Sequence, residues 1–195
     1  MARVHPGETV GSFMMKGVLE FLTSDNDEAI YLRKNYFIKV IPMLNPDGVI
    51  LGNFRTSLAG CDLNRRWDDP SELYHPEIYS AKKMILKFAE KRSIALIIDL
   101  HGHSNLYNSF IYGNHFGSND FSATKVFPYI LSKINKSFWF PYCCFKMQKF
   151  KSGAARINLF NELNELGNNV INTFTLEASF FGCKYVNLFF KFGLG

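Results

Sequence analysis

Apolar positions repeat with a helical period in three parts of the chain. In the first part, Val10, Phe13, Met14, Val18 and Phe21 fall on one broad face, as an amphipathic helix requires. The second part has a proline in its first turn, where the fixed φ of the ring suits a helix. The sequence therefore predicts helices over residues 9–22, 76–92 and 122–134.

Four other segments are apolar without a helical period, and they are bounded by turn residues. Such runs are typical of strands buried inside a sheet. The predicted strands are residues 36–44, 93–104, 109–114 and 170–180. The sequence "NPDG" at residues 45–48 predicts a turn that ends the first of them.

The order of these elements indicates an α/β fold. Helices and strands alternate, which favours a mixed open β-sheet with helices on both faces. The length of 195 residues suits a single domain covering residues 1–195. Polar residues follow the apolar strands at their carboxyl ends, and in open α/β sheets that edge is where sites form.

Composition narrows the class of protein. Hydrophobic residues make up 47% of the chain and aromatic residues 16%, so the chain is globular rather than disordered. No apolar run is long enough to span a membrane, and the N-terminus lacks the apolar segment of a signal peptide. The four cysteines form no C-x-x-C pair, which indicates free thiols in a reducing compartment, and we expect a cytoplasmic protein.

The charge pattern says less about partners. The formal net charge is +5, and the basic residues are spread along the chain. Solubility alone accounts for such a charge, while the functional alternative is attraction to an acidic partner. No nucleic-acid-binding module is recognisable, so no nucleic acid is expected as a partner.

Metal-ligand residues occur at three places near strand ends or turns. His5 and Glu8 lie three residues apart around a proline–glycine turn, His101 lies near the end of the predicted strand 93–104, and Glu177 lies in the predicted strand 170–180. Two histidines and one carboxylate would leave a tetrahedral Zn²⁺ with an open position for water, and Glu177 could then accept the proton of that water. Each residue also has a purely structural explanation. His5 would be a surface histidine, His101 a core histidine hydrogen-bonded to Asp99, and Glu177 the partner of a buried arginine.

A fourth segment, "GCDLNRRW" at residues 60–67, makes it less convincing that each of these residues has only a structural role. It places Asp62, Asn64, Arg65 and Arg66 in a short stretch flanked by apolar residues. Arginine is suited to forked, bidentate capture of a carboxylate, so this segment is a candidate for binding an acidic group.

Five motifs together resemble a known family. "HPGE", "NPDG", "DLNRRW", "DLHGHS" and "TLEASFFG" occur here in the order found in zinc carboxypeptidases. Their wording is similar to the cytosolic carboxypeptidase subfamily, whose members remove glutamates from the tails of tubulin and other proteins. The resemblance runs over residues 4–182.

The resemblance implies roles around the metal. His5, Glu8 and His101 match the ligands of one Zn²⁺, and Glu177 matches the base that activates the zinc-bound water. Asp62 matches a carboxylate that orients the first zinc histidine.

The resemblance also implies roles around the substrate. Asn64 and Arg65 match the pair that holds the terminal carboxylate, and Arg55 matches the arginine that stabilises the oxyanion. The segment "KSGAARI" at residues 151–157 resembles the lining of the pocket for the last side chain. Arg156 falls where a positive charge would meet a glutamate side chain; the alternative is a surface arginine.

These implications give a definite expectation. The fold is expected to be zinc carboxypeptidase-like and incomplete at both ends. The expected function is zinc-dependent removal of C-terminal or branch-point glutamates from acidic, tubulin-like protein tails. Two alternatives stay open at this stage: a catalytically silent, truncated relative that binds acidic tails, and a zinc deacylase of small acyl-amino acids.

Overall fold

The computed structural model describes residues 1–115, 123–147 and 151–184. In order, its helices and strands are α1 (Val10–Thr23), α2 (Asp27–Asn35), α3 (Pro46–Leu51), η1 (Leu63–Arg65), α4 (Pro76–Ala89), β1 (Ile97–His103), β2 (Ser109–Tyr112), α5 (Ala123–Ile134), η2 (Phe140–Tyr142), α6 (Ala155–Glu165) and β3 (Thr173–Ser179). The described elements before β1 are all helical, and strands and helices are interspersed only from β1 onward.

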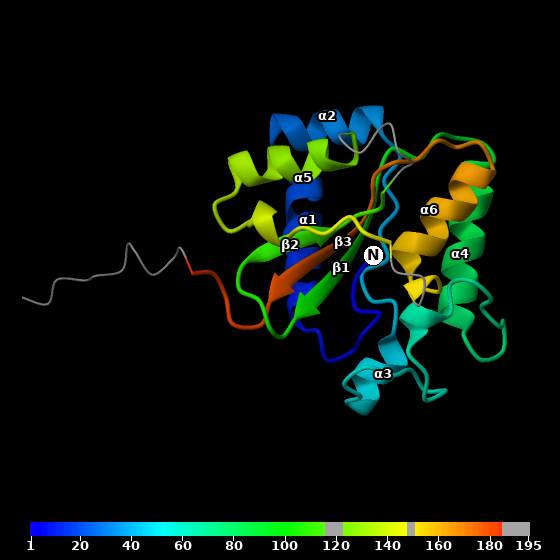
Figure 1. Ribbon diagram of the computed structural model, residues 1–195. Helices are drawn as coiled ribbons and strands as arrows, with labels where there is room; N and C mark the ends of the chain where they lie inside the picture. Colours follow the sequence, from blue (N-terminus) through cyan, green and yellow to red (C-terminus); the bar gives the residue numbers. More distant parts are fainter. Residues whose placement is uncertain (116–122, 148–150, 185–195) are drawn as a thin grey trace, which may run out of the picture.

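The three described strands form one open, mixed sheet in the order β1-β3-β2 (Figure 1). β1 runs parallel to β3, whereas β2 is antiparallel to it. This confirms the predicted mixed sheet. In the parallel pair His101 lies directly opposite Glu177, so one hydrogen-bonded register places both side chains at the same end of the sheet.

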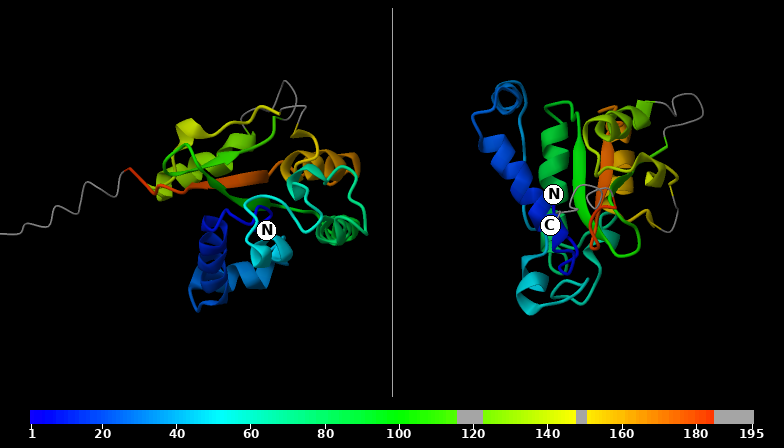
Figure 2. Two further views of the ribbon diagram at one scale, coloured as in Figure 1. Left: turned by 90° about the horizontal axis from the view of Figure 1, so that it is seen from below. Right: turned by 90° about the vertical axis from the view of Figure 1, so that its left-hand side faces the viewer.

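Helices cover both faces of the sheet, as predicted. Figure 2 shows α1 and α2 on one side of the strands and α5 and α6 on the other. On the first side Met15 of α1 packs in a core cluster with Leu100 of β1. On the other side the rings of Phe127 in α5 and Phe174 in β3 are stacked, with centroids 5.4 Å apart.

A third cluster joins α4 and α6 to the segment around η1. Trp67 and Leu63 are fully buried in it, together with Leu159 of α6. Lys82 of α4 is also buried, because its ammonium donates to the carbonyl of Trp67 at 2.6 Å and pairs with Glu162 at 2.7 Å. The segment that follows Asp62 is thereby fixed against the rest of the fold.

Residues 36–44 are not the buried strand that their apolar pattern predicts. Tyr36 and Phe37 are 50% and 67% exposed, and the segment carries no described strand. Its bonds to Ala2 come at Ile41 and Leu44, on either side of Pro42, which has no N–H to donate. An extended segment with so few ladder bonds stays irregular even when it is apolar.

The predicted turn at residues 45–48 is also corrected, because it begins α3. The side chain of Asn45 accepts the N–H of Gly48 at 3.0 Å, Pro46 occupies the first turn, and Gly52 ends the helix at a φ of 74°. Turn-forming and helix-starting residues are the same residue types, so the motif alone did not separate the two.

The hydrophobic pattern does not predict α2 or α6. α2 is largely polar, and it is helped by acidic residues in its first turn and basic residues in its last. α6 is buried on most of its surface, so its apolar positions show no single stripe.

Candidate metal centre and substrate site

The loop before α1 presents the first two candidate ligands. Arg3 lies in the left-handed backbone region, with a φ of 59°, and its guanidinium donates to the carbonyl of Pro6 at 2.6 Å and to Ser12 Oγ at 2.7 Å. These bonds brace the turn from inside. His5 and Glu8, at the two ends of that turn, are both buried.

β1 brings the third candidate ligand to the same place. One ligand atom each from His5, Glu8 and His101 lies within 4.8 Å of the other two. The two oxygens of Glu8 reach His5 Nδ1 at 2.7 Å and His101 Nδ1 at 3.0 Å. The structure therefore gathers in one cluster the three residues that the sequence singled out as metal ligands.

Each histidine is held from behind by an aspartate. His5 Nε2 lies 3.1 Å from Asp62 Oδ1, and His101 Nε2 lies 2.8 Å from Asp99 Oδ2. Both rings thus turn Nδ1 toward the cluster and Nε2 toward a carboxylate, which is the arrangement that orients metal-binding imidazoles. The sequence interpretation gave Asp99 only a core role, although its i, i+2 spacing from His101 on a strand predicts a shared face.

The charges within the cluster are strongly coupled. Burial acts to raise the pKa of Glu8, but the hydrogen bonds from His101 and His5 outweigh it and hold that pKa well below its usual range. Burial acts to lower the pKa of His101, but the charge and hydrogen bond of Asp99 raise it well above the ordinary value. The site favours positive charge at its centre, and two imidazoles with one carboxylate are ligands suited to Zn²⁺. The chemistry of this donor set fits the metal.

Glu177 is in a different electrostatic state. It is buried beside the cluster, and its Oε2 has no hydrogen-bond partner among the described residues. Burial raises its pKa to about 7, although the neighbouring charge of His101 works against the rise. A carboxyl with a pKa near neutrality suits proton transfer at neutral pH. The alternative of a buried arginine partner has no support in its described contacts.

The segment at residues 55–65 places three more candidate residues. Arg55 donates from Nε and Nη2 to Asp62 Oδ2, both at 2.8 Å. Asn64 is buried; its Oδ1 accepts the N–H of Ala155 at 2.9 Å, and its Nδ2 lies 3.5 Å from His101 Nε2. Arg65 keeps partial exposure and donates from Nη1 to the carbonyl of Asn64 at 2.7 Å.

Arg156 is buried, so the alternative of a surface arginine is wrong. It lies in the first turn of α6, and burial lowers the pKa of its guanidinium to about 10. Lys151 is close enough that the charges of Arg65 and Arg156 help to lower its pKa, after burial itself. The charge of Glu177 acts on the pKa of Lys151 in the opposite direction without outweighing these effects.

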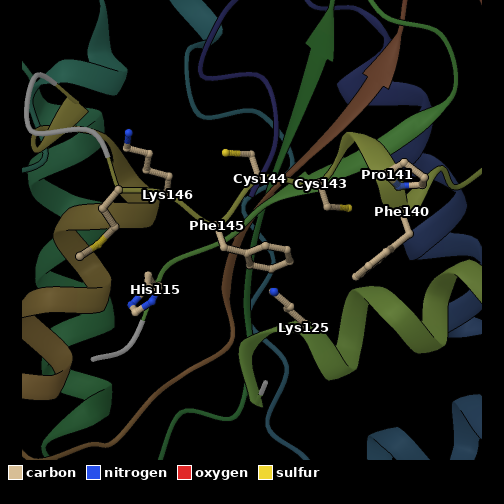
Figure 3. Close-up of a pocket in the computed structure, with 9 residues that line it drawn as sticks. His115, Lys125, Phe140, Pro141, Cys143, Cys144, Phe145 and Lys146 are labelled. Atoms are coloured by element: carbon tan, nitrogen blue, oxygen red, sulfur yellow. The ribbon is translucent and has the colours of Figure 1, made fainter. Parts of the chain in front are cut away.

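An open cavity of about 680 Å³ lies on the neighbouring surface, between α5 and the segment after η2 (Figure 3). Phe140, Phe145 and Met147 are among its apolar lining residues, and Lys125 and Lys146 are among its basic ones. None of its lining residues belongs to the His–Glu–His cluster. We therefore place the chemistry at the end of β1 and β3 rather than in this cavity.

Within the part of the chain that the structure describes, no helix combines the length and the hydrophobicity that crossing a bilayer requires.

Sequence comparison finds close relatives over most of the chain. It is 42% identical to cytosolic carboxypeptidase 2 of Xenopus tropicalis, over 95% of this chain and 19% of that protein. It is also 42% identical to human cytosolic carboxypeptidase 1, over 96% of this chain and 16% of that protein. The chain thus spans less than a fifth of the length of these two relatives.

Solved structures show the same fold. A putative carboxypeptidase from Burkholderia mallei superposes with a TM-score of 0.79 at 24% identity, covering 96% of this chain and 48% of that one. A putative carboxypeptidase A from Shewanella denitrificans gives a TM-score of 0.75 at 27% identity, with the same coverage of 96% and 48%. The model of the zinc carboxypeptidase family matches residues 1–173. These matches confirm the resemblance drawn from the five motifs, and the chain belongs to the zinc carboxypeptidase family.

Proposed function

We propose that this chain carries the catalytic machinery of a zinc-dependent metallocarboxypeptidase that removes C-terminal or branch-point glutamates from acidic protein tails such as those of tubulin. The observation that carries the proposal is the cluster of His5, Glu8 and His101 with Glu177 opposite His101 on the adjacent strand. Relatives named cytosolic carboxypeptidases support the reaction class and a cytoplasmic location.

The His–Glu–His cluster would hold the metal, and Glu177 would move the proton. Zn²⁺ held there would supply Lewis-acid chemistry at the scissile carbonyl and lower the pKa of a water molecule toward neutrality. Glu177, with a pKa of about 7, accepts a proton from the attacking water and returns it to the leaving amine. Asp62 and Asp99 keep the two imidazoles oriented throughout.

The basic residues would hold the end of the substrate. The planar guanidinium of Arg65 suits the terminal carboxylate, and Asn64 can add a donor from Nδ2, since its Oδ1 is already engaged by Ala155. Arg55 is held by Asp62 through Nε and Nη2, which leaves Nη1 to face charge that develops on the substrate carbonyl.

Acidic specificity is assigned to Arg156. A terminal glutamate brings a second carboxylate, and in a partly dry pocket that group requires a cation of its own. Arg156 supplies a buried guanidinium that can donate two parallel hydrogen bonds, and Lys151 nearby supplies a single ammonium charge.

The test is hydrolysis of two peptides that differ only in a terminal glutamate or lysine, with zinc measured on the same sample of purified chain. We expect about one zinc per chain and release of glutamate in preference to lysine. Zinc binding and peptide binding without hydrolysis would favour the silent, tail-binding relative instead. Hydrolysis of small acyl-amino acids in preference to both peptides would favour the deacylase.

A further inference from the structure

Asn114, just beyond β2, contacts the guanidinium of Arg156. Asn114 is fully buried, with an exposed fraction of 0%. Its side chain makes hydrogen bonds to two segments that meet at the substrate pocket, the start of α6 and the start of β3. A buried amide with all its groups engaged specifies local geometry, because each lost bond would leave a buried polar group unsatisfied.

Both the nitrogen and the oxygen of the Asn114 side-chain amide make hydrogen bonds. Its Nδ2 donates to the carbonyl of Arg156 at 3.1 Å and to Thr173 through Oγ1 at 2.9 Å and the carbonyl at 3.3 Å. Its Oδ1 accepts from Arg156 Nη1 at 2.6 Å. Because the nitrogen faces two carbonyls and the oxygen faces a guanidinium, this network permits one orientation of the amide.

Arg156 is consequently held from one side. Nη1 donates to Asn114 Oδ1 and to the carbonyl of Gly113, and both acceptors are uncharged. Within the described residues Nε and Nη2 make no hydrogen bond, yet neither is among the buried unpartnered atoms, so both keep some access to solvent. The guanidinium therefore retains its full charge and presents its remaining edge outward.

We propose that Asn114 is a positioning residue for acidic specificity, because it fixes Arg156 through a neutral acceptor and leaves the Nε–Nη2 edge to receive the side-chain carboxylate of a terminal glutamate. This inference rests on the proposed function, since it assumes that Arg156 lines the pocket for the last side chain. A neutral acceptor is the essential feature. A carboxylate at the same place would form an internal ion pair and compete with the substrate for the guanidinium.

The substitution Asn114→Asp tests whether the charge of this side chain, rather than its shape, matters for specificity. This substitution keeps the size of the side chain but changes the acceptor from neutral to anionic. Peptides ending in glutamate and in glutamine, otherwise identical, differ in the same respect. We expect Asn114→Asp to lower the ratio of kcat/KM for the glutamate peptide over the glutamine peptide by about tenfold or more, the effect of losing a hydrogen bond to a charged group.

Thr173→Val is the matched control. It removes a partner of Asn114 Nδ2, the end of the amide that does not contact the guanidinium of Arg156, so it loosens the same network without changing what the guanidinium meets. We expect it to lower the unfolding midpoint while leaving the glutamate-to-glutamine ratio unchanged. If Asn114→Asp lowers kcat/KM for both peptides equally, as Thr173→Val would through stability alone, the inference is overturned.

A second variant and a binding measurement test the proposal if the first variant does not fold or the chain is inactive. Asn114→Ala replaces Asn114→Asp if the latter does not fold, and a smaller fall in the ratio is expected from it, because the guanidinium is then unfixed but not neutralised. Calorimetric binding of both peptides to a Glu177→Gln background reports selectivity without catalysis. If the unmodified chain hydrolyses neither peptide, the proposed function fails, and this binding arm still tests Asn114. Equal binding of the two peptides, or binding of neither, overturns the inference.

Discussion

At the scale of single residues, the site assigns different charge states to carboxyl groups that lie close together. Glu8 and Asp62 accept hydrogen bonds from histidines, which outweigh burial and hold their pKa values low. Glu177 is buried without such donors, so its pKa rises to about 7. The number of donors that each carboxyl meets, rather than its residue type, separates the carboxyls held ionised from the one that titrates near neutrality.

Replacing Glu177 tests this separation. We expect Glu177→Gln to lower kcat by about 10²–10⁴-fold, the usual contribution of a general base, while zinc content stays unchanged. The measurement pairs peptide hydrolysis with elemental analysis of the same preparation. Loss of zinc along with activity would reassign Glu177 to the metal.

The adjacent residues Cys143 and Cys144 differ in burial, and we expect them to differ in reactivity for that reason. All four cysteines are free thiols, and Cys144 is exposed while Cys143 is half-buried. Burial raises the pKa of Cys143 to about 11, and its sulfur also accepts the N–H of Ile111 at 3.3 Å. Because the thiolate is the reactive form, Cys143 is the less reactive neighbour.

Alkylation of the folded chain with iodoacetamide at pH 8 should therefore modify Cys144 well before Cys143. Fragment-ion mass spectrometry can locate the label within the peptide that contains both residues. Denaturant provides the control, since unfolding should equalise the two rates. Equal rates in the folded chain would contradict the burial of Cys143.

At the scale of elements, α3 supports the metal loop. A Cβ built on Gly48 would lie 2.5 Å from Pro6 Cγ and 2.6 Å from the carbonyl oxygen of Thr56. Pro6 sits between two candidate ligands, so α3 packs directly against the turn that presents them. A helix that the sequence motif suggested to be only a turn thus has a structural role at the site.

The Gly48→Ala substitution should disturb both stability and metal binding. Overpacking at this contact is expected to lower the free energy of unfolding by about 1–3 kcal/mol and to weaken zinc affinity by displacing Pro6. Gly17→Ala is the control, because a Cβ built there would meet nothing within 4 Å apart from its chain neighbours and the backbone of its own helix, and alanine favours a helix. Denaturant titration with and without zinc measures both effects, and unchanged zinc affinity in Gly48→Ala would argue against the coupling.

At the scale of the whole molecule, the sequence predicts the sheet and the metal cluster better than it predicts their surroundings. The β1 and β3 runs are apolar and polar residues mark their ends, so the pattern places His101 and Glu177 near one edge of the sheet. Their direct opposition depends on the register of the strands, which the pattern does not report. Residues 36–44 have the same apolar composition, but composition does not report which backbone groups find partners.

Asn114 acts through bonds to Arg156 and Thr173, which lie far along the chain, and no local pattern predicts such bonds. Asp99 and His101, by contrast, lie two residues apart on one strand, and that spacing predicts their shared face.

The cluster also joins two distant parts of the chain, which has a measurable consequence. His5 and Glu8 precede α1, whereas His101 lies on β1, so a bound metal would link the N-terminal loop to the sheet. Zinc should raise the unfolding midpoint and a chelator should lower it again, because a ligand that binds only the folded state stabilises it by mass action.

His5→Ala should abolish that response to zinc. His103→Ala is the matched control: His103 lies two residues beyond His101 on β1, and its Nδ1 accepts the backbone N–H groups of Asn105 and Leu106 instead of joining the cluster. A zinc response that persists in His5→Ala would place the metal elsewhere.

The direct opposition of His101 and Glu177 constrains how this gene can vary in length. Side chains alternate between the faces of a strand, so one codon inserted in β3 ahead of Glu177 would turn the carboxylate to the opposite face. The same codon inserted in the connection over residues 166–172 would leave the pairing intact, since loops absorb added residues at little cost. Across related genes, insertions and deletions should therefore collect between the strands, while the spacing inside β1 and β3 stays constant.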